Sequence, residues 1–208
     1  MKEVLHVGCG KATIKKMTAG FQQGWREVRF DINPNVNPDI VGTTVDMTGV
    51  ASESVDAVYS SHNIEHVYAH QIGKVLSEFW RVLKSDGFLV VTCPNIQYVA
   101  EFIAKGQLDE PLYTSSAGPI SALDILYGHG KAIENGEEYM AHRTAFTDST
   151  LKKGLNAARF ATIGVRKHRL DLWAIATKTA VHSDVARRLM NEYLPPRDMP
   201  AGAPENSR

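Results

Sequence analysis

The stretch Val4-Leu5-His6-Val7-Gly8-Cys9-Gly10 decides the fold of this chain, because a short apolar run passes directly into a Gly-x-Gly turn. Glycine has no Cβ, so the backbone of such a turn can approach a ligand closely. The next strand-like run, residues 28–31, ends in Asp31. In a doubly wound sheet, a carboxylate at that position lies beside the turn and can accept hydrogen bonds from two ribose hydroxyls. The two features together predict a nucleoside pocket.

The composition is that of an ordinary globular protein. The chain has 208 residues, 43% of them hydrophobic and 22% charged, enough for one domain with a substantial core. Lys plus Arg and Asp plus Glu both number 23, so no net charge attracts nucleic acid or a membrane surface. There are two cysteines, Cys9 and Cys93, which predicts a reducing compartment without a disulfide framework. The sequence shows no signal peptide and no apolar run of membrane-spanning length, so we expect a soluble cytoplasmic protein with no membrane or nucleic-acid partner.

Strand-like and helix-like runs alternate along most of the chain. Strands are predicted at residues 4–7, 28–32, 39–41, 55–59 and 88–93, and helices at residues 11–19, 72–83 and 147–158. The helix at 72–83 is the clearest, because its apolar residues recur at three- and four-residue spacing, and a turn at Ser85-Asp86-Gly87 is predicted to end it. Residues 161–165 and 172–177 are predicted to form a final antiparallel hairpin, whereas a plain dinucleotide-binding fold finishes with parallel strands.

Two segments depart from this alternation. Residues from about 100 to 146 contain Pro111, Pro119 and several glycines and show no strand pattern, so they are predicted to form an insertion. Residues 181–208 are predicted to form a C-terminal tail that is amphipathic at first and polar at its end. We expect its last dozen residues to be mobile or held by a partner chain.

Five sequence motifs taken together resemble the class I S-adenosylmethionine-dependent methyltransferases, in particular the small bacterial methyltransferase-domain group. They are LHVGCG at residues 5–10, Asp31, VDM at 45–47, VDAVYSSHNIEHV at 55–67 and RVLKSDGFL at 81–89, and the resemblance covers roughly residues 3–178. It implies an α/β fold, a doubly wound three-layer sandwich whose mostly parallel seven-stranded sheet ends in an antiparallel hairpin. It also implies a methyltransferase domain over residues 1–180, with a lid-like insertion at about 100–146, and S-adenosylmethionine as cofactor. The chain departs from the family pattern at Ala12, where a third glycine is usual, and at Ser85-Asp86, where Pro-Gly is usual.

The resemblance also assigns the cofactor-binding residues. The glycine turn would meet the amino-acid portion of the cofactor, the end of the second strand would hold the ribose, the VDM segment would contact the adenine, and carbonyls after the fourth strand would meet the ammonium group. The residues concerned are Val7, Gly8, Cys9, Gly10, Asp31, Ile32, Asp46, Met47, Ser60 and Ser61.

Histidines supply the candidates for catalysis. His62 follows a central strand at the edge where ligands collect, so it is the first candidate for a general base, and His142 is the second. The insertion contains YGHG at 127–130 and EYMAHRT at 138–144, which are dense in groups that bind a polar acceptor. His129, Tyr139 and Arg143 are the candidate acceptor-binding residues, and Arg143 could clamp a carboxylate or phosphate.

Residues 62–66 also spell H-x-x-E-H, the pattern by which inverted zinc peptidases place two histidines on one helical face. A metal site would need a third protein ligand from elsewhere. The strand motif of the methyltransferases accounts for Glu65 and His66 without a metal, so we expect none.

Three functions remain open at this stage. The first is a methyltransferase acting on a small polar molecule, with a lid supplied by the insertion or by a second subunit of a homo-oligomer. Ser61-His62-Asn63-Ile64 stands where base N-methyltransferases carry Asn/Asp-Pro-Pro-Tyr, so an oxygen acceptor is favoured. The second is a cofactor-binding domain without catalysis. The third is an NAD-dependent oxidoreductase, which Thr13 disfavours because G-x-G-x-x-G requires glycine there.

Overall fold

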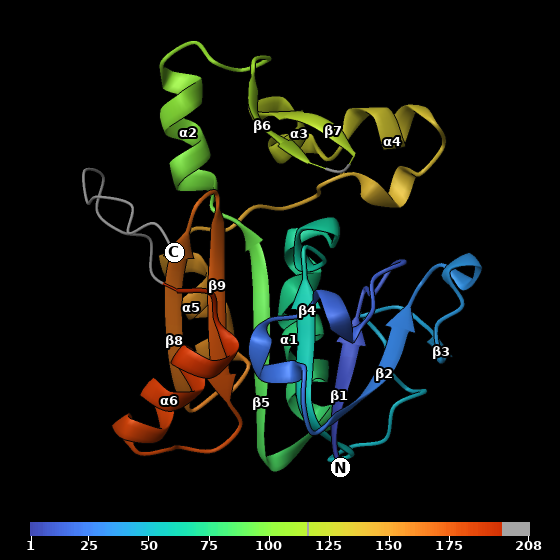
Figure 1. Ribbon diagram of the computed structural model, residues 1–208, viewed down its shortest axis with the longest axis vertical. Coiled ribbons are helices and arrows are strands. Elements are labelled where there is room, and N and C mark those ends of the chain that lie inside the picture. Colours follow the sequence, from blue (N-terminus) through green and yellow to red (C-terminus); the bar gives the residue numbers. More distant parts are fainter. Residues whose placement is uncertain (116, 197–208) are drawn as a thin grey trace.

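The computed structural model describes residues 1–115 and 117–196, and it is built around a seven-stranded sheet of order β3-β2-β1-β4-β5-β9-β8 (Figure 1). The strands are β1 (Lys2–Val7), β2 (Trp25–Asp31), β3 (Ile40–Val41), β4 (Val55–Ser61), β5 (Leu83–Pro94), β8 (Thr162–His168) and β9 (Asp171–Thr177). The first five pair in parallel, and β9 pairs antiparallel with both β5 and β8. This order confirms the predicted doubly wound sandwich and its terminal hairpin.

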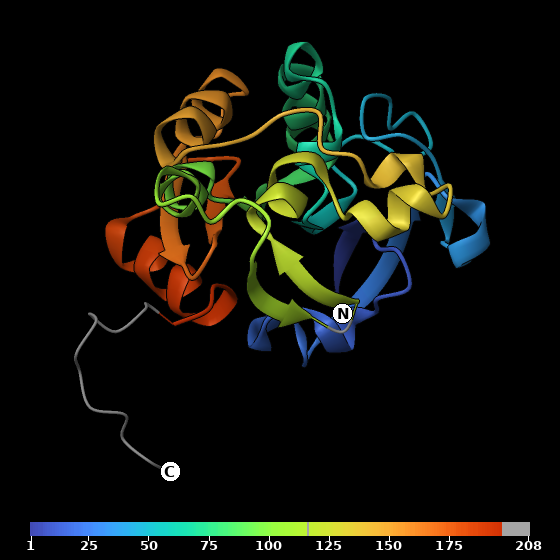
Figure 2. The same cartoon turned by 90° about the horizontal axis from the view of Figure 1, so that it is seen from above.

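Helices α1 (Ile72–Val82) and α5 (Asp148–Ala157) cover one face of the sheet (Figure 2). The apolar side of α1 is buried as its spacing predicts, and Leu76 and Phe79 pack with Leu5 and Val58 of the strands. The predicted start of α5 is confirmed, since the Thr147 hydroxyl accepts from the Thr150 amide in a capping box.

The opposite face is covered by the C-terminal helix α6 (Ser183–Tyr193) and by two short 3-10 turns, η1 (Ile14–Lys16) and η2 (Ala19–Phe21) (Figure 2). Their buried side chains pack on the strand residues that alternate with those of the first face. Tyr193 is 4% exposed, and its ring lies 4.8 Å from that of Phe21 and 4.7 Å from that of Phe88. The first part of the predicted tail therefore completes the hydrophobic core.

The helix predicted at residues 11–19 is wrong, because η1 and η2 occupy this region. Side chains compete for the backbone groups that a helix would use: the Ile14 amide donates to the Glu27 carboxylate at 2.9 Å, and the Gln22 side chain donates to the carbonyls of Ile14 and Met17. Burial of Phe21 then holds η2 against the sheet.

The predicted end of the helix at residues 85–87 is also wrong. Helix α1 ends at Val82, and residues 83–87 belong to β5, where the pairing with β4 shifts between Val55–Leu83 and Ala57–Phe88. Gly87 permits this irregularity, because a Cβ there would lie 3.0 Å from the Lys84 carbonyl and 3.1 Å from that of Asp56.

The insertion predicted without strands is a folded cap, by which we mean residues 96–115 and 117–146. It contains α2 (Ile96–Ala104), β6 (Pro111–Ser115), β7 (Gly118–Ser121), α3 (Ala122–Tyr127), α4 (Gly130–Glu134) and the 3-10 turn η6 (Glu138–Met140). Val99, Ile120, Ala122 and Ile125 give it a small core of its own. Figure 1 shows the cap above the ends of β1, β4 and β5, and Figure 2 shows it extending across that edge of the sheet.

Three further 3-10 turns, η3 (Pro34–Val36), η4 (Ile64–His66) and η5 (Ala69–Gln71), follow β2 and β4. Among the described residues, no helix combines the length and apolar character needed to cross a membrane. The expectation that the last dozen residues are mobile concerns positions outside the described part of the chain.

Candidate functional site

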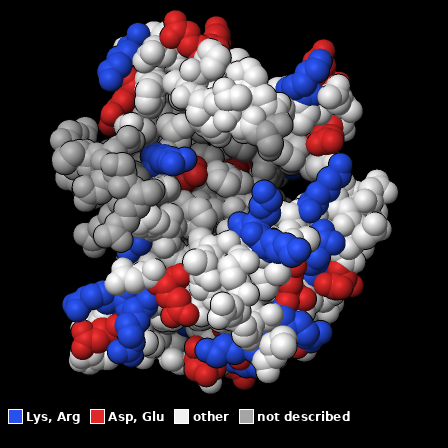
Figure 3. Space-filling model, in the orientation of Figure 1, with Lys and Arg blue, Asp and Glu red and all other residues white. Residues whose placement is uncertain are grey.

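A cavity of about 1170 Å³ lies where the carboxyl ends of β1, β2 and β4 meet the cap. In the space-filling view the surface is hollowed between the cap and the sheet (Figure 3). The sheet side of the wall includes Gly8, Gly10, Asp31, His62 and Asn63, and the cap side includes Glu137, Tyr139, Met140 and Arg143. The edge of a doubly wound sheet at which ligands bind is therefore enclosed by two parts of the chain.

The Gly-x-Gly turn has a backbone that favours glycine at both positions. Gly8 has φ +64° and Gly10 has φ +52°, both in the left-handed region. A Cβ at Gly8 would also overlap the side-chain amide of Asn63, 2.6 Å from its Cγ. The turn thus brings backbone to the cavity wall and lets Asn63 pack directly on it.

Asp31 lies at the end of β2 with its carboxylate at the cavity wall and only 8% of the residue exposed. One carboxylate oxygen accepts from the Gly10 amide at 2.7 Å, and the other accepts from the Asn33 amide at 2.8 Å. These bonds fix the carboxylate beside the glycine turn, and each oxygen keeps lone-pair capacity for a further donor.

The remaining predicted cofactor residues divide into two groups. Ile32, which is 59% exposed, and Asp46 lie at the cavity wall. Val7, Cys9, Met47 and Ser60 are buried behind it, and Ser61 is half-buried. The Met47 side chain belongs to the main hydrophobic core. Its backbone is held to α1, because its amide donates to Glu78 and its carbonyl accepts from Arg81. Burial raises the pKa of the Cys9 thiol to about 11, so it stays protonated.

His62 is held between two carboxylates after the end of β4. Its backbone has φ +47°, and its ring nitrogens lie 3.2 Å from Glu65 and 3.5 Å from Asp171. Partial burial alone would lower the pKa of His62, but the nearby carboxylates of Asp171 and Glu65 outweigh it and raise the pKa. The side chain is 46% exposed and lies at the cavity wall. It is therefore a hydrogen-bond donor at neutral pH.

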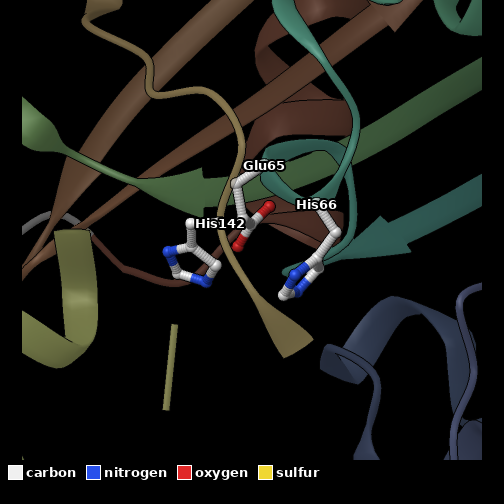
Figure 4. Close-up of side chains that lie close together, drawn as sticks. All are labelled: Glu65, His66 and His142. Carbon is white, nitrogen blue, oxygen red and sulfur yellow. The ribbon is translucent and has the colours of Figure 1, made fainter. Parts of the chain in front are cut away.

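Of the other predicted polar residues, the structure brings Tyr139 and Arg143 to the cavity and places His129 and His142 elsewhere. His129 is the N-cap residue of α4, on the outer part of the cap. His142 lies beside Glu65 and His66, with its ring 4.8 Å from that of His66 (Figure 4). Burial lowers the pKa of His142.

The cap is joined to the sheet side of the cavity by direct contacts. The Asn33 side chain donates to the Tyr139 hydroxyl at 3.0 Å, and the amides of Arg143 and Thr144 donate to the Glu65 carbonyl. The Arg143 guanidinium lies over the Tyr68 ring, 4.7 Å from its centroid. Asn63, Tyr68 and Gln71 also line the cavity. Asn63 lies within the fourth-strand motif and the other two follow it closely, and that position was the signal that could have found them.

Comparison with known proteins agrees with this geometry. Residues 5–91 match the family model described as a methyltransferase domain. No curated protein matches the chain.

Solved structures share the fold at low sequence identity. A SAM-dependent methyltransferase from Archaeoglobus fulgidus is 15% identical with a TM-score of 0.53, covering 84% of this chain and 85% of that one. One from Methanosarcina mazei is 16% identical with a TM-score of 0.55, covering 85% and 92%. One from Thermotoga maritima, described as a possible histamine N-methyltransferase, is 15% identical with a TM-score of 0.53, covering 86% and 83%.

Residues 5–91 match the methyltransferase-domain model, and the sheet has the fold of the solved S-adenosylmethionine-dependent methyltransferases. These two findings support the predicted methyltransferase class, its enzymatic activity and S-adenosylmethionine as its cofactor.

Proposed function

We propose that this enzyme methylates an oxygen atom of a small polar acceptor bound under the cap. The observation that carries the proposal is the continuity of the cavity, which extends from Gly8 and Asp31 at one end to Tyr139 and Arg143 at the other. Its volume of about 1170 Å³ exceeds that of most single-ligand pockets, ~300–1,000 Å³. A cofactor and an acceptor would fit in it together.

At the sheet end of the cavity, the lining residues suggest which part of the cofactor each of them would contact. Asp31 would accept hydrogen bonds from the ribose hydroxyls, while the Gly8–Gly10 backbone would lie against the amino-acid portion. Ile32 offers an exposed apolar surface for the adenine ring, and Asp46 an acceptor for its amino group. Ser60 and Ser61 would contribute through backbone carbonyls. This arrangement would leave the sulfonium methyl directed toward His62 and the cap.

At the cap end, the polar groups suit an acceptor that carries oxygen. Arg143 can pair with a carboxylate, and Tyr139 can donate through its hydroxyl. His62, whose two ring nitrogens face Glu65 and Asp171, would present a positive charge to the acceptor rather than take its proton. Methyl transfer from a sulfonium is an in-line displacement, so most of the protein's contribution is the alignment of the two reactants.

Asp31→Ala tests the cofactor site. We expect S-adenosylmethionine to bind at least about 100-fold more weakly, because two hydrogen bonds to a charged group are lost, at ~1.5–3 kcal/mol each. Calorimetry on the full chain measures this. Asp86→Ala, which removes an exposed carboxylate in β5, is the matched control and should bind as the wild type does. Equal affinities for the two variants would refute the ribose assignment.

Arg143→Ala tests the acceptor site. Turnover is followed as formation of S-adenosylhomocysteine with a panel of hydroxylated and carboxylated metabolites. For an acceptor with a carboxylate we expect KM to rise about tenfold or more, since a charge-assisted bond is lost, at ~1.5–3 kcal/mol. The exposed Arg188→Ala on α6 serves as control. Failure of every acceptor in the panel to yield product would favour the non-catalytic alternative.

A further inference from the structure

Glu65, His66 and His142 form a compact cluster behind the cavity wall. Each offers one ligand atom, and these atoms all lie within 4.8 Å of one another. Glu65 and His66 belong to η4, just after β4, whereas His142 lies on the segment that returns from the cap. Figure 4 shows the Glu65 carboxylate between the two rings.

Backbone carbonyls orient both rings toward this carboxylate. His66 Nδ1 lies 3.2 Å from the Ala141 carbonyl oxygen, and His142 Nδ1 lies 2.8 Å from that of Ile125. A ring nitrogen that faces a carbonyl carries the proton, so Nε2 of each ring carries the free lone pair. Metal-binding histidines are held in this way, with one nitrogen donating to a carbonyl and the other on the metal.

The carboxylate itself lacks the partners that burial requires. Glu65 is 1% exposed, and within the described residues neither of its side-chain oxygens has a hydrogen-bond partner of acceptable geometry. Its nearest cationic group is His62, with Nδ1 3.2 Å from Oε1. Burying an anion costs free energy unless the anion is paired or coordinates a metal. His62 faces only Oε1 of Glu65, so Oε2 is left for another cation.

We propose that Glu65, His66 and His142 bind a divalent transition-metal ion through two imidazole nitrogens and one carboxylate oxygen. This donor set suits Zn²⁺ and related ions, and three protein ligands leave a coordination position open. Because His66 also lines the cavity, an ion held by this cluster would lie next to the cavity. The sequence motif H-x-x-E-H pointed to His62 as a ligand, but the third ligand comes from the cap.

The consequence for the reaction rests on the proposed function. An ion held by Glu65, His66 and His142 would stabilise the oxyanion of a nearby acceptor hydroxyl, whose proton would then pass to water more easily. That oxygen forms a bond to the sulfonium methyl carbon, the carbon–sulfur bond breaks, and its electron pair stays on sulfur. The products are the methyl ether or ester, the thioether form of the cofactor and the released proton.

Calorimetric titration of the metal-stripped full chain with Zn²⁺ tests the site. We expect one ion per chain, with affinity at least about 100-fold weaker in Glu65→Gln and in His142→Ala, since loss of even an outer-shell partner costs ~10–100-fold. His70→Ala, which removes an exposed histidine of η5, should bind as the wild type does. Zn²⁺ should also raise Tm in the wild type and in His70→Ala, because the ion would join η4 to the cap.

The same experiment separates this inference from the proposed function. Should Zn²⁺ bind the wild type and His142→Ala equally, or bind neither, the metal site is refuted. S-adenosylmethionine affinity is measured on the same stripped samples and should be unchanged by His142→Ala. If circular dichroism shows that Glu65→Gln is unfolded, the metal site is tested by His142→Ala and by the visible spectrum of the Co²⁺-loaded wild type. A spectrum without tetrahedral or five-coordinate character would overturn the assignment.

Discussion

Gly8→Ala is expected to remove detectable binding of S-adenosylmethionine, with affinity at least about 100-fold below that of the wild type. The left-handed backbone at φ +64° costs an alanine ~1–2 kcal/mol. In addition, its Cβ would overlap the Asn63 side chain, so Asn63 or the turn must move into the space that the cofactor needs. Calorimetry with S-adenosylmethionine on the folded variant is the measurement.

Gly24→Ala is the matched control for this variant. Gly24 has φ +78°, and apart from its two chain neighbours no part of the described chain lies within 4 Å of a Cβ placed there, so the substitution carries the same kind of strain without the overlap. It lies at the start of β2, away from the cavity. We expect a modest loss of stability and unchanged affinity. If both variants bound the cofactor equally well, the glycine turn would not be part of its site.

Tyr193→Ala is expected to lower the free energy of unfolding by about 3–5 kcal/mol, the usual cost of deleting a buried aromatic ring. The ring contacts Phe21 and Phe88, so its loss leaves a cavity beneath α6. Apart from α6, the short turns η1 and η2 cover this face of the sheet in the described part of the chain. Thermal unfolding should show Tm reduced by roughly 10 °C.

Arg187→Ala provides the comparison on the same helix. Its side chain is 72% exposed and pairs only with Asp184 across one helical turn among the contacts of the described chain, so the change should stay within about 0.5 kcal/mol. A Tyr193→Ala variant as stable as Arg187→Ala would show that α6 is an appendage and not part of the core.

Local sequence patterns were sufficient to predict the strands and helices that depend on residues close together in the sequence. The apolar runs of β1, β4 and β5 predict buried parallel strands, and the spacing in α1 predicts its buried side. The start predicted for α5 at residue 147 is confirmed, because its cap involves residues only three positions apart.

Other features depend on contacts between distant segments, which local patterns do not report. The region after β1 lacks the predicted helix because Glu27, on the next strand, takes the Ile14 amide. The cap becomes ordered through the small core around Val99 and Ile120.

The cap end of the cavity also depends on contacts between distant segments. Asp171 reaches His62 only because β9 pairs with β5, and His142 reaches Glu65 only because the cap returns across η4. Even so, Gly8, Asp31, His62 and Arg143 were found from sequence and all line one cavity.

In the proposed site, the cofactor's nucleoside would lie against the glycine turn with its ribose on Asp31. A crystal structure of the full chain with S-adenosylhomocysteine tests it directly. We predict both ribose hydroxyls within ~3 Å of the Asp31 carboxylate, the usual hydrogen-bond distance, and the thioether sulfur directed toward His62 beneath the cap. A ligand bound outside this cavity, or one whose ribose faces away from Asp31, would contradict it.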